Sequence, residues 1–216
     1  MNYNKEMENI LMELKKANKV PKLLLHSCCA PCSSHVISVL TEYFDITILY
    51  YNPNIEPFDE YEKRKQEEIR FINEFPNTNK LDIIDCDYDN DLFKEMSKGL
   101  EDAKECGPRC IKCYHLRLNK TAEIASHLKY DYFATTLTVS PLKNSEKLNQ
   151  IGLLLQDVYN VKYLVSDFKK KEGYKHSIEL AKEYDLYRQD YCGCIYSKQQ
   201  REQEKANKNK KEDVYE

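Results

Sequence analysis

Short apolar runs rich in β-branched and aromatic residues alternate along this chain with longer stretches of helical periodicity. We expect strands at residues 22–27, 46–51, 81–85, 132–136 and 163–165. Helical patterns lie between them, at residues 32–43, 58–74, 89–98, 110–128 and 145–157. Such alternation is typical of a parallel sheet with helices on both faces, and it predicts an α/β fold. In these sheets, ligands bind beyond the carboxyl ends of the strands.

The chain of 216 residues is long enough to bury the core of one domain. We predict a single α/β domain over residues 1–197, opened by an amphipathic helix at about residues 4–18. Residues 198–216 lose their apolar positions and are expected to form a charged, disordered tail. Apolar runs stay far below the roughly 18–20 residues that span a bilayer, and the first residues do not resemble a signal peptide. We therefore expect a cytoplasmic protein with no membrane partner.

Nine cysteines point to metal or redox chemistry in a reducing compartment. They gather in three clusters, namely Cys28-Cys29 with Cys32, Cys110-x-x-Cys113 with Cys106, and Cys192-Gly-Cys194. Only Cys86 stands alone at the end of an expected strand, where it suits a small buried apolar residue. Closely spaced thiols are what a thiophilic metal or a thiol–disulfide couple requires.

Cys110 and Cys113 follow Gly107-Pro108, which marks the start of a helix. Their spacing places both thiols on one face of the first turn, where the helix dipole is expected to make them acidic. Such a pair serves as half of a zinc or iron–sulfur site, as a redox couple, or as packing. The residues favour metal ligation.

Cys28 and Cys29 lie where the first expected strand ends and a helix begins. Neighbouring cysteines pair poorly with each other, but both can ligate a multi-iron cluster. Together with Cys110 and Cys113 they complete a set of four thiolates, which zinc also accepts in a closed tetrahedral site. The position at the ligand-binding edge of a parallel sheet favours an iron–sulfur cluster.

Cys192-Gly-Cys194 can close a small, strained and easily reduced disulfide. The two thiols could also be further metal ligands or packing residues, but redox exchange is the interpretation we prefer. Cys106, Cys110 and Cys113 share the spacing of radical S-adenosylmethionine enzymes, although Lys112 occupies the usual aromatic position. The chain has five glycines and neither a Walker A nor a GxGxxG sequence, which argues against ATP-driven chemistry.

Several basic and hydroxyl-bearing residues lie close to the thiol clusters in the sequence. Arginines at these positions suit phosphate or an anionic cofactor, and hydroxyls at the end of the fourth strand suit a nucleoside. His26 is expected to be a hydrogen-bonded core histidine, with proton donation as the alternative. The net charge of −3 does not itself indicate nucleic acid, but seventeen tyrosines offer surfaces on which bases stack. The candidate substrate residues are Arg109, Arg117, Thr135, Thr136, Ser140, Lys143, Arg188 and Tyr191.

Five ordered blocks of this sequence resemble the QueH family of epoxyqueuosine reductases. The blocks are LLLHSCCAPC at 23–32, YYNPNI at 50–55, RCIKCYHLRL at 109–118, FATTLTVSPLK at 133–143 and YRQDYCGCIYS at 187–197. The resemblance implies a HUP-like α/β fold related to adenine nucleotide alpha hydrolases, without their phosphate loop. It implies a 4Fe–4S cluster, an additional metal ion (iron) nearby, and neither cobalamin nor ATP. The reaction implied is the last step of queuosine biosynthesis, the reduction of epoxyqueuosine in the tRNA anticodon loop by an unidentified electron donor.

The resemblance also implies roles for individual cysteines. Cys28, Cys29, Cys110 and Cys113 match the positions of the cluster ligands, and Cys192 with Cys194 match a redox-active pair. Cys32 falls where the family is less uniform and is a candidate ligand of the second metal. Three rivals stay open, namely a zinc module that binds RNA, a tRNA-thiolating enzyme that needs ATP, and a radical S-adenosylmethionine enzyme.

Overall fold

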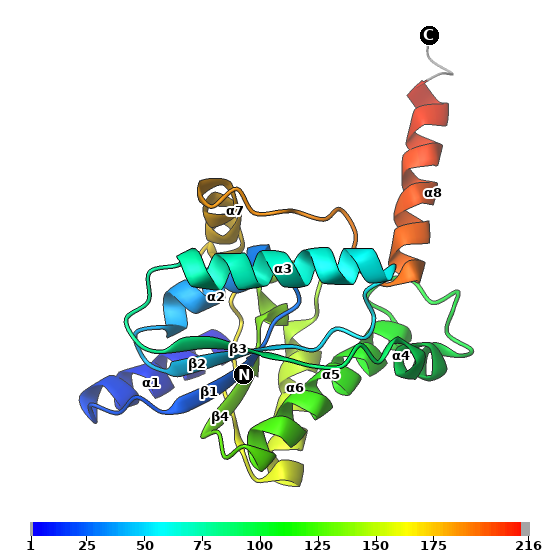
Figure 1. The fold of residues 1–216 in the computed structure, drawn as a ribbon. Coiled ribbons are helices and arrows are strands. Elements are labelled where there is room, and N and C mark those ends of the chain that lie inside the picture. Colours follow the sequence, from blue (N-terminus) through cyan, green and yellow to red (C-terminus); the bar gives the residue numbers. More distant parts are fainter. Residues whose placement is uncertain (1, 213–216) are drawn as a thin grey trace.

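The computed structural model describes residues 2–212, which form a five-stranded parallel sheet between layers of helices (Figure 1). The strands are β1 Lys22–His26, β2 Asp45–Tyr50, β3 Leu81–Asp85, β4 Tyr132–Thr135 and β5 Lys162–Tyr163. The helices are α1 Tyr3–Lys16, α2 Ala30–Leu40, α3 Phe58–Glu74, α4 Asn90–Ser97, α5 Pro108–His127, the short 3-10 helix η1 Thr136–Val139, α6 Ser145–Tyr159, α7 Gly173–Glu183 and α8 Ile195–Glu212. Every strand and helix expected from the sequence is present at or beside its predicted position, and the predicted α/β class is confirmed.

The strand order is β3-β2-β1-β4-β5, with β1 at the centre. Leu23, Leu24 and Leu25 of β1 have no exposed surface, because helices cover both faces of a parallel sheet. The chain winds outward in opposite directions from β1 and β4, which are paired in parallel. In doubly wound sheets the crevice for ligands opens at this reversal, outside the carboxyl ends of the two strands.

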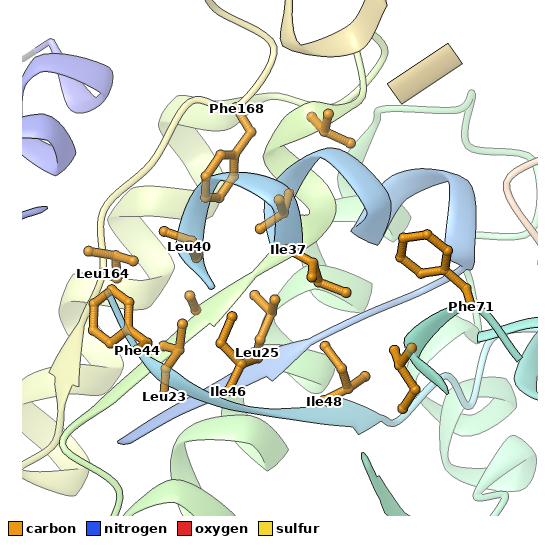
Figure 2. Packing of buried hydrophobic residues seen from close by; sticks show 14 of the residues in the cluster. Leu23, Leu25, Ile37, Leu40, Phe44, Ile46, Ile48, Phe71, Leu164 and Phe168 are labelled. Carbon is orange, nitrogen blue, oxygen red and sulfur yellow. The ribbon is translucent and has the colours of Figure 1, made fainter. Parts of the chain in front are cut away.

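One face of the sheet carries α1, α2, α3 and α7. Figure 2 shows Ile37 and Leu40 of α2 above Leu23 and Leu25 of β1. Phe71 of α3 belongs to the same cluster. Fully burying each such side chain contributes about 1.5–3 kcal/mol, so this packing holds α2 firmly against the strand that precedes it.

The opposite face carries α5 and α6. Leu118 and Ala122 of α5 and Leu155 of α6 pack in one cluster with Leu24 of β1 and Phe133 of β4. The alternation of Leu23 and Leu25 with Leu24 along β1 therefore assigns α2 and α5 to opposite faces. Each of these two helices begins near the carboxyl edge of the sheet with a cysteine cluster in its first residues.

Two elements differ from the sequence-based expectation. Helix α7 was not predicted, and it packs against α2 through an apolar face that includes Leu180 and Ala181. Residues 198–216 were expected to form a charged, disordered tail, whereas the structure continues α8 through them as far as Glu212. Lysine, glutamate and glutamine have high helix propensity, which the lack of apolar residues had masked. Residues 213–216 lie outside the described part, and among residues 2–212 no helix is long and apolar enough to cross a membrane.

Candidate metal and redox site

The first thiol cluster lies where β1 passes into α2. Cys28 and Cys29 are buried and Cys32 is half-buried on the first turn of α2, whose N-cap is Cys29. The Sγ atoms of Cys28 and Cys29 are 3.8 Å apart, and those of Cys29 and Cys32 are 2.9 Å apart. All three sulfur atoms lie within 4.8 Å of one another, which is close enough for joint contact with a metal.

The three thiols differ in acidity. Hydrogen bonding by Cys29 and Cys32 holds the pKa of the Cys28 thiol well below its usual range. The same hydrogen bond to Cys28 raises the pKa of Cys29 to about 12. Cys32 has a raised pKa because it too hydrogen bonds to Cys28. Cys28 is therefore the sulfur of this cluster that is most readily a thiolate.

The second cluster lies on the first turn of α5, which Pro108 begins. Cys110 packs against the apolar cluster that contains Cys28 and Cys29, whereas Cys113 packs with Cys194 and Phe93. The expectation of acidic thiols is wrong for this pair in the structure. Burial raises the pKa of Cys110 to about 12 and that of Cys113 to about 11, and so outweighs the helix dipole. Coordination to a metal cation would reverse this balance.

The third cluster lies in the loop before α8. Cys194 is buried, with its sulfur 3.4 Å from the Ser197 hydroxyl, and Cys192 is half-buried. Gly193 between them has φ of +135°, a conformation that side chains rarely adopt. A Cβ atom there would lie 2.9 Å from the side chain of Ile55. The Gly193 carbonyl accepts a hydrogen bond of 2.9 Å from the amide of Glu56, so the loop after β2 holds this turn.

Arg64 of α3 binds the same loop through hydrogen bonds to its backbone carbonyls. Its guanidinium is 1% exposed and donates to the carbonyl of Cys192 at 3.1 Å and to that of Tyr191 at 3.5 Å. The Nε atom binds Glu60 at 2.7 Å. Burial opposes the charge of Arg64, but Cys29 and Glu60 near it raise its pKa above the ordinary value. Arg64 thus lies between the first and third cysteine clusters, a role that sequence analysis missed.

Two further cations lie among the thiols. Arg117 of α5 is 1% exposed, and its best contacts are the carbonyl of Cys113 and Oδ1 of Asn52, both at 3.5 Å. Burial disfavours its charge, but the sulfurs around it, Cys113 first among them, raise its pKa. The half-buried Lys143 behaves alike, since Cys192 and other sulfurs raise its pKa against the effect of burial. No carboxylate forms an ion pair with either cation in the described part of the chain.

A pocket of about 460 Å³ opens beside these groups. Four of the candidate substrate residues line it, and so do Cys32 and Cys192. Arg188 is exposed at its wall, and Tyr191 is anchored by a hydrogen bond of 2.8 Å from its hydroxyl to the carbonyl of Glu56. The volume of this pocket lies in the range of small-molecule binding sites. The four substrate candidates that line it are Ser140, Lys143, Arg188 and Tyr191.

The other substrate candidates are buried. Thr135 and Thr136 have no exposed surface, and the Thr135 hydroxyl contacts His26 Nδ1 at 3.0 Å and accepts from the Leu137 amide at 3.1 Å. Arg109 is 1% exposed and donates to the carbonyls of Leu100 and Glu101. The geometry therefore does not favour direct substrate contact by these residues or by Arg117.

His26 is a hydrogen-bonded core histidine, as the sequence predicted. Its ring nitrogens contact the Thr135 hydroxyl at 3.0 Å and the carbonyl of Tyr51 at 3.2 Å, and it is fully buried. Burial, followed by the charge of Arg117, lowers its pKa to about 3. A neutral imidazole with both nitrogens engaged is a poor proton donor.

The remaining cysteines lie at the periphery. Cys106 is exposed with φ of +67°, and its amide donates to the sulfur of Cys110 at 3.3 Å. Its own sulfur contacts the carbonyl of Leu142 at 2.6 Å. Cys86 is half-buried after β3, in keeping with a packing residue. Neither one joins the group of three thiols around Cys29, and the sulfurs of Cys110, Cys113, Cys192 and Cys194 also lie outside that group.

Residues 23–200 of this chain match the model of a protein family described as epoxyqueuosine reductase QueH. A relative from Streptococcus pyogenes named epoxyqueuosine reductase QueH is 43% identical, over 91% of this chain and 78% of the relative. A relative of the same name from Staphylococcus epidermidis is 42% identical, over 91% of this chain and 84% of the relative. Another from Thermotoga maritima is 32% identical, over 88% of this chain and 96% of the relative.

Among solved structures, a predicted subunit of tRNA methyltransferase from Methanocaldococcus jannaschii aligns with a TM-score of 0.48. It is 16% identical and covers 74% of each chain. A likeness of this strength decides nothing about function.

Proposed function

Because this chain belongs to the QueH family of epoxyqueuosine reductases, we propose that it reduces epoxyqueuosine at the tRNA wobble position to queuosine, using the cysteine site described above. The reaction removes the epoxide oxygen as water and leaves a carbon–carbon double bond, so it consumes two electrons and two protons. One observation carries the assignment of this site. Cysteines from three distant segments gather with the buried Arg117 and the half-buried Lys143 at the carboxyl edge of the sheet.

We assign Cys28, Cys29, Cys110 and Cys113 as ligands of a 4Fe–4S cluster. The chemistry of the donor set supports this assignment, since thiolates are the usual ligands of such clusters. The charges support it as well. A buried cation without a carboxylate is costly, and an anionic thiolate cluster beside Arg117 would compensate it. When bound, a cluster of this type supplies electrons singly.

Cys32 is the proposed ligand of an additional metal ion, taken here as iron. Its sulfur lies 2.9 Å from that of Cys29, and it also lines the pocket. A cation held there would face the space in which the substrate is expected.

Cys192 and Cys194 are the proposed redox pair. Oxidation of two thiols to a disulfide releases two electrons and two protons, which is the amount that removal of the epoxide oxygen consumes. Both are free thiols in the structure, and the positive φ of Gly193 turns the chain sharply between them. An external reductant must then restore the dithiol after each turnover.

The pocket beside Cys192 is the proposed site of the substrate nucleoside. Lys143 keeps its proton there, because neighbouring sulfurs raise its pKa despite burial. Its ammonium group can therefore stabilise negative charge on the departing oxygen. Ser140, Arg188 and Tyr191 would complete the walls with hydroxyl, guanidinium and aromatic surface. A base of an anticodon loop is accessible for such recognition because it is not held in a duplex.

Cysteine substitutions test this proposal. After anaerobic purification, Cys29→Ala and Cys110→Ala should lose cluster iron, sulfide and colour together with turnover on tRNA carrying epoxyqueuosine. Cys194→Ser should retain iron and sulfide but lose turnover with dithionite as the reductant. Cys86→Ala is the matched control and should retain both. Normal turnover by Cys194→Ser would refute the redox pair, whereas a colourless wild-type protein containing only zinc would refute the cluster.

A further inference from the structure

Helix α8 projects away from the body of the molecule, at the opposite end from α1 (Figure 1). It spans 18 residues, and after Ile195 and Tyr196 its only apolar residue is Ala206. From 201 to 207 every residue is exposed. A helix that is polar on all sides gains little stability from packing on the core of its own chain. Its surface is therefore available for a binding partner.

The charge of α8 is opposite to that of the whole chain. The helix contains six lysines and arginines against three glutamates, whereas the chain carries a net charge of −3. Lys198, Arg201 and Lys205 are spaced three and four residues apart, which places them on one face of the helix. A positive segment on a negative protein is typical of an element that binds a polyanion.

The ion pairs of α8 are exposed and weak. Arg201 binds Glu204 at 2.8 Å and Lys205 pairs with Asp190, while all four side chains are open to solvent. Such pairs contribute roughly 0–1 kcal/mol each. Phosphate groups can therefore replace these carboxylates at little cost, with additional gain from released counterions.

The root of α8 lies at the proposed substrate pocket. The helix starts directly after Cys194, and its residues Gln200, Arg201 and Glu204 line the pocket with Lys143. At about 1.5 Å per residue the helix is about 27 Å long, so it reaches well beyond a single nucleotide held in the pocket. A nucleic acid with one nucleoside in this pocket would have its flanking backbone next to the helix.

We propose that α8 is an RNA-binding arm whose basic face lies along the phosphate backbone flanking the wobble nucleoside. This inference rests on the proposed function for its choice of RNA. A polyanionic RNA fits better than an acidic electron-donor protein, because the same helix both lines the pocket and extends away from it. The arm would supply sequence-independent affinity, while the pocket would select the modified nucleoside.

The test reverses charge on the arm while every residue that lines the pocket is kept. The variant carries Lys205→Glu, Lys208→Glu and Lys211→Glu, and its matched control carries Lys15→Glu, Lys16→Glu and Lys19→Glu at the far end of the molecule. A second variant ends after Glu204, which leaves every pocket residue in place. Binding to full-length tRNA without epoxyqueuosine is measured over a series of salt concentrations, and this measurement requires no reductase activity.

We expect both arm variants to bind tRNA at least tenfold more weakly than the control. The slope of log affinity against log salt should become shallower by about one for each lysine that meets a phosphate. With dithionite as the reductant, the loss of kcat/KM on full tRNA should exceed the loss on a trinucleotide centred on epoxyqueuosine by at least tenfold. If the arm variants bind tRNA with the same affinity and salt slope as the control, the proposal that α8 binds RNA is refuted. So would normal turnover with dithionite combined with a loss confined to a protein electron donor, because the helix would then bind that donor.

Failure of the arm and failure of the proposed function are distinguishable. If the wild-type protein reduces neither RNA but the arm variants still lose tRNA affinity, the arm stands and the reductase assignment falls. If the wild-type protein is active and the arm variants bind tRNA like the control, only the arm falls.

Discussion

Glu68 is a carboxyl group enclosed in the core beside the cysteine-bearing turn. It lies on α3 with no exposed surface, and neither of its oxygens makes a hydrogen bond of good geometry. Burial raises its pKa to about 8, and the nearby hydroxyls of Ser33 and Ser27 offset only part of this rise. Glu68 is thus protonated at neutral pH, so it adds no negative charge to the core near the thiols.

This protonation makes stability depend on pH. Between the ordinary pKa of 4.5 and about 8 the folded chain holds a proton that the unfolded chain has lost. The free energy of unfolding should therefore fall as pH rises through this window, by up to about 1.4 kcal/mol per pH unit. Glu68→Gln has the same shape and no titration, so it should remove this fall.

Urea unfolding of wild type and variant at pH 5, 6, 7 and 8 measures the effect. The buried histidines contribute to both proteins alike and cancel in the difference between the two curves. Parallel curves across the whole range would contradict a protonated Glu68.

Residue type decides which members of the site the sequence could predict. The cysteines could be predicted, because closely spaced thiols rarely serve a purpose other than metal binding or redox chemistry. Arg64 and Glu68 do not, since they lie in a helix full of lysines and glutamates that reads as a solvated face. Thr135 was predicted at the correct strand end, but its hydroxyl contacts His26, a partner from another strand that the sequence alone does not reveal. Proximity in the fold, not spacing in the chain, determines these roles.

At the scale of elements, apolar periodicity was sufficient where a helix or strand packs on the sheet. The run of leucines in β1 and the apolar face of α5 both predicted their elements. Helix α7 escaped because its apolar positions are few and follow a lysine-rich segment. Helix α8 escaped because it has almost no apolar face at all. Helix α7 depends on its contact with α2, and α8 forms without an apolar face, so apolar periodicity indicates neither helix.

The connection between α3 and the Cys192–Cys194 loop belongs to this scale as well. Arg64→Ala removes the donors to the carbonyls of Cys192 and Tyr191 and leaves Glu60 without its partner. We expect a loss of about 2–4 kcal/mol in stability and a tenfold or greater fall in turnover. Alkylation of Cys192 by iodoacetamide should become faster because its loop opens. Arg64→Lys should rescue only part, since an ammonium group lacks the planar fork.

Arg70→Ala is the matched control for this change. Arg70 lies on the same helix and donates to the carbonyl of Tyr184, away from the cysteine loop. Its variant should leave the alkylation rate of Cys192 unchanged. An Arg64→Ala protein with wild-type alkylation and turnover would show that the loop keeps its shape without α3.

At the scale of the whole molecule, the site joins the two layers of helices. Cysteines at the starts of α2 and α5 approach the central strand from opposite faces, and the loop before α8 closes over them from the end of the chain. An anionic cofactor held by both layers would therefore contribute to the stability of the entire fold. Its removal would leave the buried Arg117 with only the free sulfurs around it to offset its charge.

This coupling predicts opposite effects of one substitution in the loaded and stripped protein. Removing iron anaerobically with a chelator should lower the melting temperature, at about 2–4 °C per kcal/mol for a chain of this size. Arg117→Met, which retains volume but removes charge, should destabilise the loaded protein. In the stripped protein the same substitution should be neutral or stabilising, because it deletes a buried charge that has lost its main anionic partner and keeps only the free sulfurs. Scanning calorimetry of the four samples measures both effects. An equal loss in the loaded and stripped forms would mean that Arg117 serves packing alone and that charge compensation does not link the cofactor to the fold.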